Sequence, residues 1–525
     1  MAAGSFPKIG EYGFLSDCHT GALLGPDGAI EWLCLPRFDS PSVFGAVLDR
    51  EAGRFRVGPA NEVPISRRYV PGTNAIETTW AADGGWLVVS DALAIGPWEE
   101  DHVDHHTRAP TDMDARHLLV RRVECTAGEV EIELLCDLYA DYGRRRLDWE
   151  VADDRRIATA KLDDELGVAL STDLHLGADE GIVRGRHFIS EGESCFVALG
   201  WGSEPRTLES SEEAASELAQ TERFWRRWLA RGDFPDHPWR VHLQRSALVL
   251  KGLTYLPTGA TVAALTTSLP ETPGGERNWD YRYTWIRDAT FTLWSLHILG
   301  FDWEARDFIS FVADLCRAEG AETQIMYGIG GEKELTESEL GHLSGYEGAR
   351  PVRIGNGAFD QRQNDVFGAL LDSVYIHTKA RDHIPSELWK IVADQVEGAV
   401  EVWEAPDQGI WEARGAPKHY ISSKLMCWVA LDRGARLAAA RDDERAERWA
   451  EIAAEIREDV LDNGVRDDGV FRQHYETDSL DASTLLIPLV RFLPPDDERV
   501  RNTVLAIERD LTRHGLVLRY ITDET

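Results

Sequence analysis

Residues 276–289 read ERNWDYRYTWIRDA and combine two tryptophans, two tyrosines, three arginines and three carboxylates in one short run. An apolar stretch to Leu299 follows, and its spacing predicts a helix that is buried on both sides and capped by Thr284. Arg287 and Asp288 then fall in the first turn, at the mouth of the core that the helix enters. This arrangement indicates either a grip on a polyol, with indole rings covering the sugar, or a structural ion pair at a helix start.

The composition limits the class of protein. A chain of 525 residues with 43% hydrophobic residues and 18 tryptophans suggests two or more domains with large cores. The net charge of −35 argues against nucleic acid and anionic membranes as partners. No apolar run reaches membrane-spanning length, and residues 1–8 lack the apolar segment of a signal peptide. The seven scattered cysteines indicate buried thiols in a reducing compartment, so we expect a cytoplasmic protein of unspecified oligomeric state.

The pattern of apolar residues changes along the chain and predicts a multidomain protein. Residues 1–210 contain short apolar or alternating runs separated by turn signals, which predict an N-terminal antiparallel β-sandwich domain. Residues 211–236 predict a helical linker, in which Trp225 and Trp228 have the spacing of core residues; a sugar-binding role is the alternative. Residues 237–525 are predicted to be helical. The clearest expected strands are Ala29–Leu35, His117–Cys125, Val130–Leu138 and Cys195–Leu199.

The helices expected after residue 237 are joined by alternately long and short loops, which predicts a helical toroid. The expected helices are Pro238–Leu256, Thr284–Leu299, Trp303–Arg317, Gln363–Lys379, Ser386–Trp403, Lys418–Ala439, Asp442–Leu461, Asp481–Phe492 and Glu498–Thr512.

Histidine-rich and isolated polar residues give no sign of a cofactor. The run DHVDHH at residues 101–106 has no spacing typical of a metal site, so a solvated loop is the better interpretation. His342 and His419 are isolated in the sequence, and structural roles are expected for both. Neither a phosphate-binding loop nor a Ser-His-Asp motif is present. We therefore expect neither an organic cofactor nor a metal ion.

Several short motifs share one order along the chain. They are residues 11–13 (EYG), 27–34 (DGAIEWLC), 36–40 (PRFDS), the strip 276–289, 345–346 (GY), 351–356 (PVRIGN) and 409–412 (GIWE). In sequence and order they resemble glycoside hydrolase family 15, the glucoamylases, glucodextranases and bacterial-type trehalases. The resemblance covers nearly the whole chain and implies that the N-terminal β-sandwich is followed by an (α/α)6 helical barrel of twelve helices.

The resemblance also implies a general acid for splitting a glycosidic bond. Glu412 matches the acid of the family, in a loop that begins where Pro406 ends the preceding helix. Trp411 beside it would shield the carboxyl group from water, which favours the protonated form that an acid catalyst needs. Some members of the family carry a second carboxylate after the acid, whereas this chain has Ala413 there, so its contacts with the leaving group differ.

Other residues of these motifs match the family's sugar-binding pocket. The resemblance implies that Arg287 and Asp288 hold the terminal glucose and that Trp285 and Trp411 form walls of the pocket. The further substrate-binding candidates are Tyr283 and Asp280. Arg353 and Asn356 either shape the pocket or brace a loop.

The second carboxylate of the family, the general base, follows a region that resembles residues 515–520 (GLVLRY). We therefore expect the base beyond Thr525 and a barrel truncated at its C-terminal end. The expected activity is that of an exo-acting inverting hydrolase that removes glucose from maltooligosaccharide, isomaltooligosaccharide or trehalose. The alternatives are an inverting disaccharide phosphorylase on a related barrel and a sugar-binding protein without catalysis.

Overall fold

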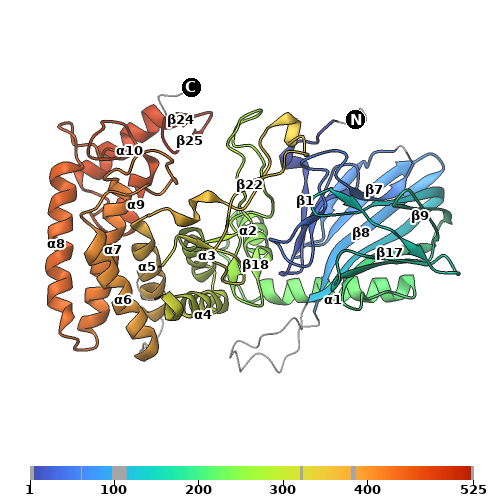
Figure 1. Ribbon diagram of the computed structural model, residues 1–525, viewed down its shortest axis with the longest axis horizontal. Coiled ribbons are helices and arrows are strands. Elements are labelled where there is room, and N and C mark those ends of the chain that lie inside the picture. The colour runs from blue at the N-terminus through green and yellow to red at the C-terminus, as the bar shows by residue number, and fades with distance from the viewer. Residues whose placement is uncertain (1–4, 61, 97–114, 320–322, 380–385, 522–525) are drawn as a thin grey trace.

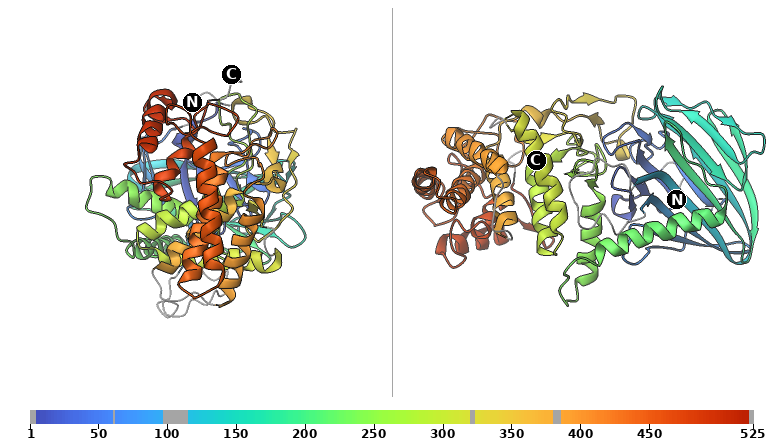
Figure 2. Two further views of the ribbon diagram at one scale, coloured as in Figure 1. Left: turned by 90° about the vertical axis from the view of Figure 1, so that its left-hand side faces the viewer. Right: turned by 90° about the horizontal axis from the view of Figure 1, so that it is seen from below.

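The computed structural model describes the chain apart from residues 1–4, 61, 97–114, 320–322, 380–385 and 522–525, so the run at 101–106 lies outside the described residues. The described part is elongated, with a sheet domain at one end and helices at the other (Figure 1). Helix α1 (Ser211–Leu229) runs along the sheet domain towards the helices (Figure 2). Within the described residues, none of the helices has the length and apolar character needed to cross a membrane.

The sheet domain is built from short antiparallel strands. They are β1 (Gly13–Ser16), β2 (Gly21–Leu24), β3 (Ala29–Cys34), β4 (Ser42–Phe44), β5 (Arg54–Pro59), β6 (Ser66–Tyr69), β7 (Ile76–Ala82), β8 (Gly85–Ile95), β9 (Ala115–Asp137), β10 (Tyr139–Ala140), β11 (Arg145–Arg146), β12 (Glu150–Val151), β13 (Ile157–Lys161), β14 (Gly167–Thr172), β15 (His175–Asp179), β16 (Ile182–Ser190) and β17 (Ser194–Gly202). All the pairings between these strands are antiparallel, as the sequence predicts.

Strand β9 organises this domain because it belongs to two sheets in turn. Its first half pairs with β8 and β17, and its second half pairs with β5 and β16. The change of sheet comes near Gly128, where φ is +75° and a Cβ atom would lie 2.0 Å from the carbonyl oxygen of Gly84. Only glycine fits such a site. The two strands expected at His117–Cys125 and Val130–Leu138 are therefore one continuous strand.

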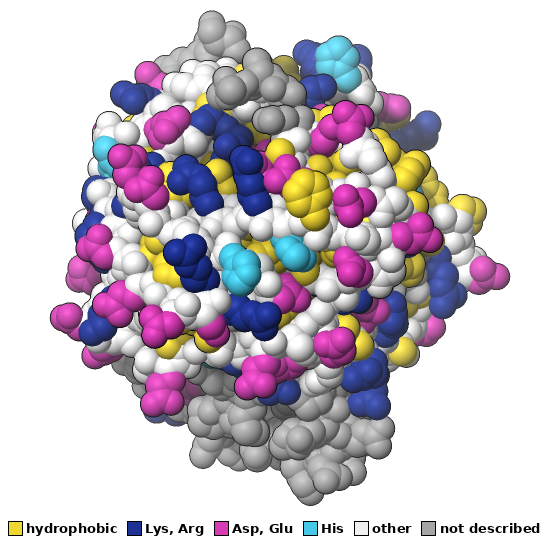
Figure 3. Space-filling model, turned by 90° about the vertical axis from the view of Figure 1, so that its right-hand side faces the viewer, with side chains coloured by type: hydrophobic (Ala, Val, Ile, Leu, Met, Phe, Trp, Pro, Cys, Tyr) yellow, Lys and Arg dark blue, Asp and Glu magenta, His cyan; other side chains and the backbone are white. Residues whose placement is uncertain are grey.

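Alternation of side chains fills the space between the two sheets. In β7, Ile76, Thr78 and Trp80 point inwards and are buried, while Glu77 and Thr79, which alternate with them, are half-buried. The core that results contains apolar side chains from both sheets and one buried ion pair, Arg121–Asp91, at 2.7 Å. On the face of the molecule that Figure 3 shows, basic and acidic side chains are interspersed, so the negative net charge is not gathered on that face.

Helix α1 joins the two parts of the molecule. It packs on β8, β9 and β17, and two of its tryptophans lie in an apolar cluster shared with the helices. Trp225 is fully buried, and the ring of Trp228 stacks on Phe301 at 4.2 Å while its Nε1 donates to Glu304 at 2.6 Å. The expectation of core packing for both tryptophans is confirmed.

The helices after α1 alternate between an inner and an outer layer. They are α2 (Arg240–Gly252), α3 (Ile286–Ile298), α4 (Asp302–Glu319), α5 (Asp365–Lys379), α6 (Ser386–Val402), α7 (Ile421–Ala439), α8 (Arg445–Asn463), α9 (Leu486–Leu489) and α10 (Glu498–Leu511), with the 3-10 turns η3 (Tyr346–Gly348), η4 (Gly357–Asp360) and η5 (Ala482–Leu485). A further 3-10 turn, η1 (Ile9–Glu11), precedes β1 in the sheet domain. Helix α5 packs between α3 and α7. Of the outer helices, α4 packs on α3 and α5, α6 packs on α5 and α7, and α8 packs on α7. Helix α7 is buried along most of its length, as an inner helix must be.

Two expectations about α3 are wrong. Thr284 does not cap the helix: Thr284 and Trp285 form strand β20, which pairs with β21 (Met326–Tyr327), and the helix begins at Ile286. The helix is also not buried on both sides, because Ser295 and Ile298 are exposed. Backbone pairing with a segment that is remote in sequence has overridden the local capping signal. The residues of the strip alone do not indicate this pairing.

Short two-stranded pairs lie outside the helices. Besides β20–β21, whose strands are separated by α3 and α4, they are β18 (Thr254–Tyr255) with β19 (Ala260–Thr261), β22 (Ser338–Glu339) with β23 (Arg353–Ile354), and β24 (Thr512–Arg513) with β25 (Leu516–Val517). Strands of two residues are too short to produce an alternating pattern, so the sequence does not predict them.

Candidate active site

The loops that precede the inner helices enclose a cavity of about 180 Å³. Its walls come from the strip before α3, the loop before α5, the loop before α7 and the segment that follows β25. The lining residues are Glu271, Arg277, Trp279, Tyr281, Trp285, Asn356, Ala358, Trp411, Glu412, Ala413, Arg414, Arg519 and Tyr520. Three tryptophans, two tyrosines and several charged side chains suit a ligand that has both C–H faces and hydroxyl groups.

The backbone at Glu412 has an uncommon conformation. Its φ is +50°, in the left-handed region that non-glycine residues seldom adopt, and Gly409 before it has φ of +70°. Hydrogen bonds from the N–H of Glu412 to Gly409 O and from the N–H of Ala413 to Gln408 O close this tight loop. Strain of this kind gathers at functional sites, where the surrounding structure keeps a side chain in one orientation.

Arg287 holds the loop of Glu412 through two hydrogen bonds. Its Nη1 donates to the carbonyl oxygen of Ile410 at 2.6 Å, and its Nη2 donates to Oε1 of Glu412 at 2.9 Å. Burial alone would lower the pKa of Arg287, but the carboxylates of Glu412, Asp288 and Asp365 outweigh burial and raise it. Among the described residues, Oε2 of Glu412 has no hydrogen-bond donor, so one carboxylate oxygen is oriented by Arg287 and the other stays uncommitted.

Asp365, the first residue of α5, lies beneath this pair. It is 2% exposed, its Oδ2 is 3.9 Å from Nη1 of Arg287, and its Oδ1 has no hydrogen-bond partner in the described part of the chain. Burial raises its pKa to about 7; Arg287 opposes this shift, while Asp407 and Glu412 add to it. A carboxyl group that titrates near neutral pH therefore lies directly behind the Arg287–Glu412 contact.

The aromatic walls are held by polar contacts. Nε1 of Trp411 donates to both oxygens of Asp481, at 3.1 and 3.0 Å, and its ring lies 6.4 Å from that of Tyr520. The ring of Trp285 lies 5.7 Å from that of Tyr281. Indole rings fixed in this way present faces that need no reordering when a sugar binds.

A charged pair closes one side of the cavity. The guanidinium of Arg519 lies 3.2 Å from Glu271, and the Tyr281 hydroxyl donates to the same carboxylate at 3.4 Å. Arg519 also lies over Trp411, 5.3 Å from its ring centre. Burial, helped by Glu271 and Glu412, raises the pKa of Tyr281, so this phenol keeps its proton and serves as a donor.

Two predicted binding residues support the cavity from within the core. Asp280 is fully buried and pairs with Arg282 at 2.7 Å, and its Oδ2 accepts the N–H of Gly355. The hydroxyl of Tyr283 accepts from the same N–H, and Asn356 donates to the backbone oxygen of Asp280. Neither Asp280 nor Tyr283 is among the lining residues of the cavity, whereas Asn356 is.

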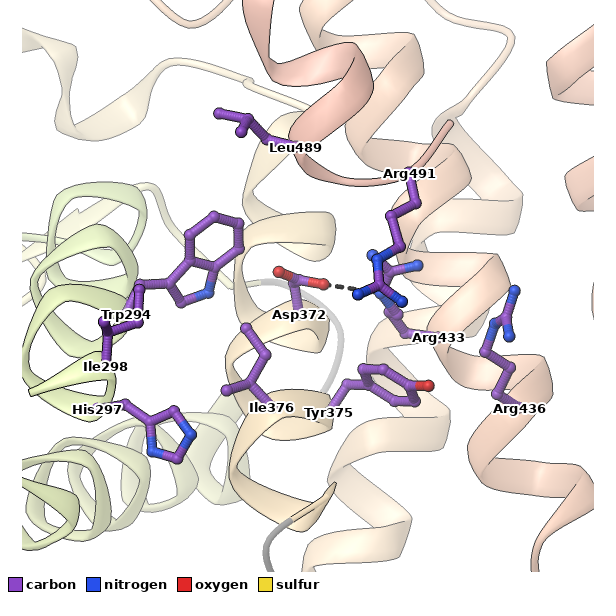
Figure 4. Close-up of a pocket in the computed structure, with 10 residues that line it drawn as sticks. All are labelled: Trp294, His297, Ile298, Asp372, Tyr375, Ile376, Arg433, Arg436, Leu489 and Arg491. Carbon is purple, nitrogen blue, oxygen red and sulfur yellow. Dashed lines mark hydrogen bonds and ion pairs between the residues drawn. The ribbon is translucent and has the colours of Figure 1, made fainter. Parts of the chain in front are cut away.

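A second cavity, of about 250 Å³, is lined by residues further along the inner helices α3, α5 and α7 (Figure 4). Its described lining contains a single carboxylate, Asp372, and Figure 4 shows this group joined to Arg433, at 2.7 Å. Arg436 and Arg491 also line it. Asp372 is buried beneath its ion pair, whereas Glu412 is partly exposed beside aromatic walls and keeps one carboxylate oxygen uncommitted, so the cavity at Glu412 is the better candidate site.

Comparison with known proteins identifies the family. Residues 238–525 match the model of Glycosyl hydrolases family 15, and residues 2–109 match that of the trehalase-like N-terminal domain. The chain belongs to glycoside hydrolase family 15. It is 54% identical to the trehalase of Mycolicibacterium smegmatis, over 99% of this chain and 80% of that protein, and 31% identical to the trehalase of Thermoplasma volcanium, over 99% and 81%.

Solved structures support the same fold. A bacterial glucoamylase complexed with acarbose superposes with a TM-score of 0.65 at 12% identity, over 97% of this chain and 79% of that chain. The arrangement of an antiparallel sheet domain before an (α/α)6 barrel is thus confirmed, and the chain is a glycoside hydrolase that acts on carbohydrate.

The cavity at Glu412 is lined by some of the predicted residues and by several that the sequence did not single out. Glu412, Trp285 and Trp411 line it, Arg287 lies directly behind Glu412, and Asp288 lies beside Arg287 with its Oδ2 at 3.7 Å. The lining residues missed are Glu271, Arg277, Trp279, Tyr281, Ala358, Arg414, Arg519 and Tyr520. Several of these belong to the strip or to residues 515–520, where aromatic and arginine content was the available signal.

Proposed function

We propose that this glycoside hydrolase is a trehalase that splits α,α-trehalose with inversion, and that Glu412 is its general acid. The observation that carries the proposal is the Glu412 carboxyl group, held by Arg287 at the edge of an aromatic cavity. The identity of this chain to trehalases, 54% and 31% along nearly its full length, supports trehalose as the substrate.

The proposed roles follow from the contacts of each residue. Arg287 occupies Oε1 of Glu412, so the proton is delivered to the glycosidic oxygen from Oε2. Trp285 and Trp411 cover the C–H faces of the deeper glucose. Asp288 is not one of the lining residues, but its half-exposed carboxylate lies beside Arg287 and accepts hydrogen bonds from hydroxyl groups of that glucose. Asp280 and Tyr283 act indirectly, by fixing the loop at Gly355.

Inversion requires a second carboxylate about 6.5–9.5 Å from the first, with water between them. Among the described residues, the other carboxylate that lines the cavity is Glu271, which is already bound by Arg519 and Tyr281. Neither Glu476 nor Asp478 is among the described lining residues of the cavity; Glu476 forms an ion pair with Lys418, and Asp478 lies beside Arg472. Glu524 lies outside the described residues. That the base follows residues 515–520 stays a prediction.

A panel of substrates tests the proposed specificity. Glucose release is measured from trehalose, maltose, isomaltose and dextran, with and without inorganic phosphate, and the first-formed anomer is identified by NMR. We expect that one of the two glucose units of trehalose is released first as β-glucose, and that this release does not require phosphate. Formation of glucose 1-phosphate would establish a phosphorylase instead, and binding of trehalose in a calorimeter without turnover would establish a binding protein.

The variant Glu412→Gln tests the acid. It retains the size of the side chain but cannot donate the proton, so kcat should fall by about 10²–10⁴ while the Kd for trehalose changes little. Glu332→Gln is the matched control, because Glu332 is a half-exposed carboxylate that pairs with Arg37, away from the cavity lining. Normal turnover by Glu412→Gln would remove Glu412 from this role.

A further inference from the structure

Trp279, at the rim of the cavity, lies between two arginines. The guanidinium carbon of Arg414 is 4.0 Å from the centre of its ring, and that of Arg353 is 4.5 Å away. Both distances lie within the range of a cation–π contact. Glu337 ties the group together, accepting from Nη2 of Arg414 at 3.0 Å and lying 3.5 Å from Nε of Arg353.

The two arginines are not equivalent. Arg353 is 14% exposed and donates to the backbone oxygens of Glu276 and Asn278, so its donors are used to brace the loop. Arg414 is 48% exposed and lines the cavity, and in the described residues its hydrogen-bond acceptor is Glu337 alone. A guanidinium has five N–H donors, so most of those of Arg414 are available to a ligand.

Glu337 is suited to hold Arg414 in place. Burial would raise the pKa of Glu337, but hydrogen bonds from Arg414 and from the N–H of Gly357 outweigh burial and lower it. The carboxylate therefore stays charged to a lower pH than a free glutamate. Since the ion pair and Trp279 both restrain Arg414, little side-chain freedom is lost when a ligand binds.

The depth of the loop places Arg414 next to the leaving group. Ile410 is buried, Glu412 is partly exposed and Arg414 is the most exposed of the three, so the loop rises from the core to the rim. Glu412 protonates the oxygen that joins the two sugars. Under the proposed function, the sugar that is cleaved at its anomeric carbon would lie on the deeper side of that oxygen, where Trp285 is buried, and the departing sugar would lie on the outer side, where Arg414 is exposed.

We propose that Arg414, held on Trp279 by Glu337, binds the hydroxyl groups of the departing hexose and thereby gives the enzyme its preference for a disaccharide. This inference rests on the proposed function, because it assumes that Glu412 protonates the linking oxygen. It also accounts for the small residue Ala413, which leaves the space beside Glu412 open to the sugar that Arg414 binds.

Two substrates separate recognition of the departing group from catalysis. Trehalose carries a second hexose, whereas α-glucosyl fluoride has a leaving group too small to reach Arg414. For Arg414→Met we expect kcat/KM on trehalose to fall at least tenfold, mainly through KM, and kcat/KM on α-glucosyl fluoride to stay within twofold. Glu337→Gln should change the ratio of the two values in the same direction by a smaller factor, and it serves as the second variant should Arg414→Met fold poorly.

The control is Arg448→Met, which removes a half-exposed arginine paired with Glu397 at 2.7 Å on the outer helices. It should leave both substrates unaffected. Equal losses on both substrates for Arg414→Met, or no loss on either, would overturn the inference. The rate of the unmodified enzyme on trehalose tests the proposed function separately: if it prefers another disaccharide, the ratio is measured with that disaccharide and still decides the role of Arg414.

Discussion

The strip 276–289 contains two arginine–aspartate pairs in quite different surroundings. In the first, Arg282 and Asp280 are both fully buried at 2.7 Å, and Arg282 also donates to Ser40 O and Tyr142 Oη of the sheet domain. In the second, Arg287 and Asp288 are 3.7 Å apart, and the side chain of Asp288 is 44% exposed. Each arginine has an aspartate and an aromatic residue within two positions along the sequence, but Arg282 joins the domains and Arg287 holds Glu412.

The difference shows that residue type alone does not decide the role of such a pair. A buried ion pair with all its donors satisfied contributes to a unique fold, and breaking it leaves an uncompensated charge. A partly open arginine that holds a carboxyl group can instead orient a reacting atom. The strip therefore contains a structural ion pair, Arg282–Asp280, that the sequence did not single out, and the role of Arg287 and Asp288 in a sugar site stays a prediction.

The largest effect is expected for Arg282→Met, which should destabilise the protein without changing its chemistry. The variant leaves Asp280 buried and unpaired, which typically costs about 3–5 kcal/mol of the free energy of unfolding. Denaturation by urea, followed by tryptophan fluorescence, measures the loss. The fraction that remains folded should show an unaltered kcat.

Arg68→Met is the matched control for this variant. Arg68 pairs with Glu77 at 2.6 Å on the surface of the sheet domain, and exposed pairs contribute about 0–1 kcal/mol. If Arg282→Met cost no more than Arg68→Met, the buried pair would not join the domains in the way that we describe.

A smaller effect, on activity, is expected for Arg287→Met. The variant removes two hydrogen bonds, to Ile410 O and to Glu412, and charged hydrogen bonds contribute about 1.5–3 kcal/mol each. If one such bond is lost in the transition state, kcat falls by roughly ten- to hundredfold. Steady-state kinetics on trehalose measure this, and the midpoint of urea denaturation should move less than for Arg282→Met.

Arg433→Met is the control for Arg287→Met, because Arg433 joins Asp372 on the same layer of inner helices at the second cavity. It should lower stability and leave kcat of the folded protein unchanged. An Arg287→Met enzyme that melted early but turned over normally would show that both pairs of the strip are structural.

Much of this architecture follows from the sequence because it depends on local patterns. The change from alternating strands to helices near residue 211 and the burial of Trp225 and Trp228 are of this kind. The candidate acid could be found because the motif GIWE at 409–412 is short and contiguous.

Features that depend on remote segments could not be found in this way. Because Thr284 pairs with Tyr327, the helix begins at a different residue from the one that its capping signal indicates. Glu271, Arg414 and Arg519 meet at one cavity only because the loops before α3 and α7 and the end of hairpin β24–β25 converge. The spacing of residues within one segment does not predict that residues of different loops come into contact. The contact of Arg287 with Glu412 is a further example.

The smallest expected effect concerns Asp365, which lies behind Arg287 but is not part of either arginine–aspartate pair. The charged or titratable groups that face it are Arg287 from α3, Asp407 and Glu412 from the loop before α7, and Cys427 from α7. Its raised pKa means that the folded protein binds the proton more tightly than the unfolded chain, whose aspartate has an ordinary pKa near 3.8. Its contribution to stability is therefore most favourable at low pH and is lost as the pH rises towards 7.

For Asp365→Asn we therefore expect an effect that depends on pH. Asparagine stays neutral, so the free energy of unfolding of the variant relative to the unmodified protein should rise between pH 5 and pH 8, by on the order of 2 kcal/mol. Urea denaturation at the two pH values measures the difference. Asp372→Asn, on the same helix, loses a carboxylate that is paired with Arg433 at 2.7 Å and should be destabilising at both values. A difference for Asp365→Asn that is the same at pH 5 and pH 8 would mean that Asp365 is already ionised in the folded protein, and that Arg287 is shared between two carboxylates rather than committed to Glu412.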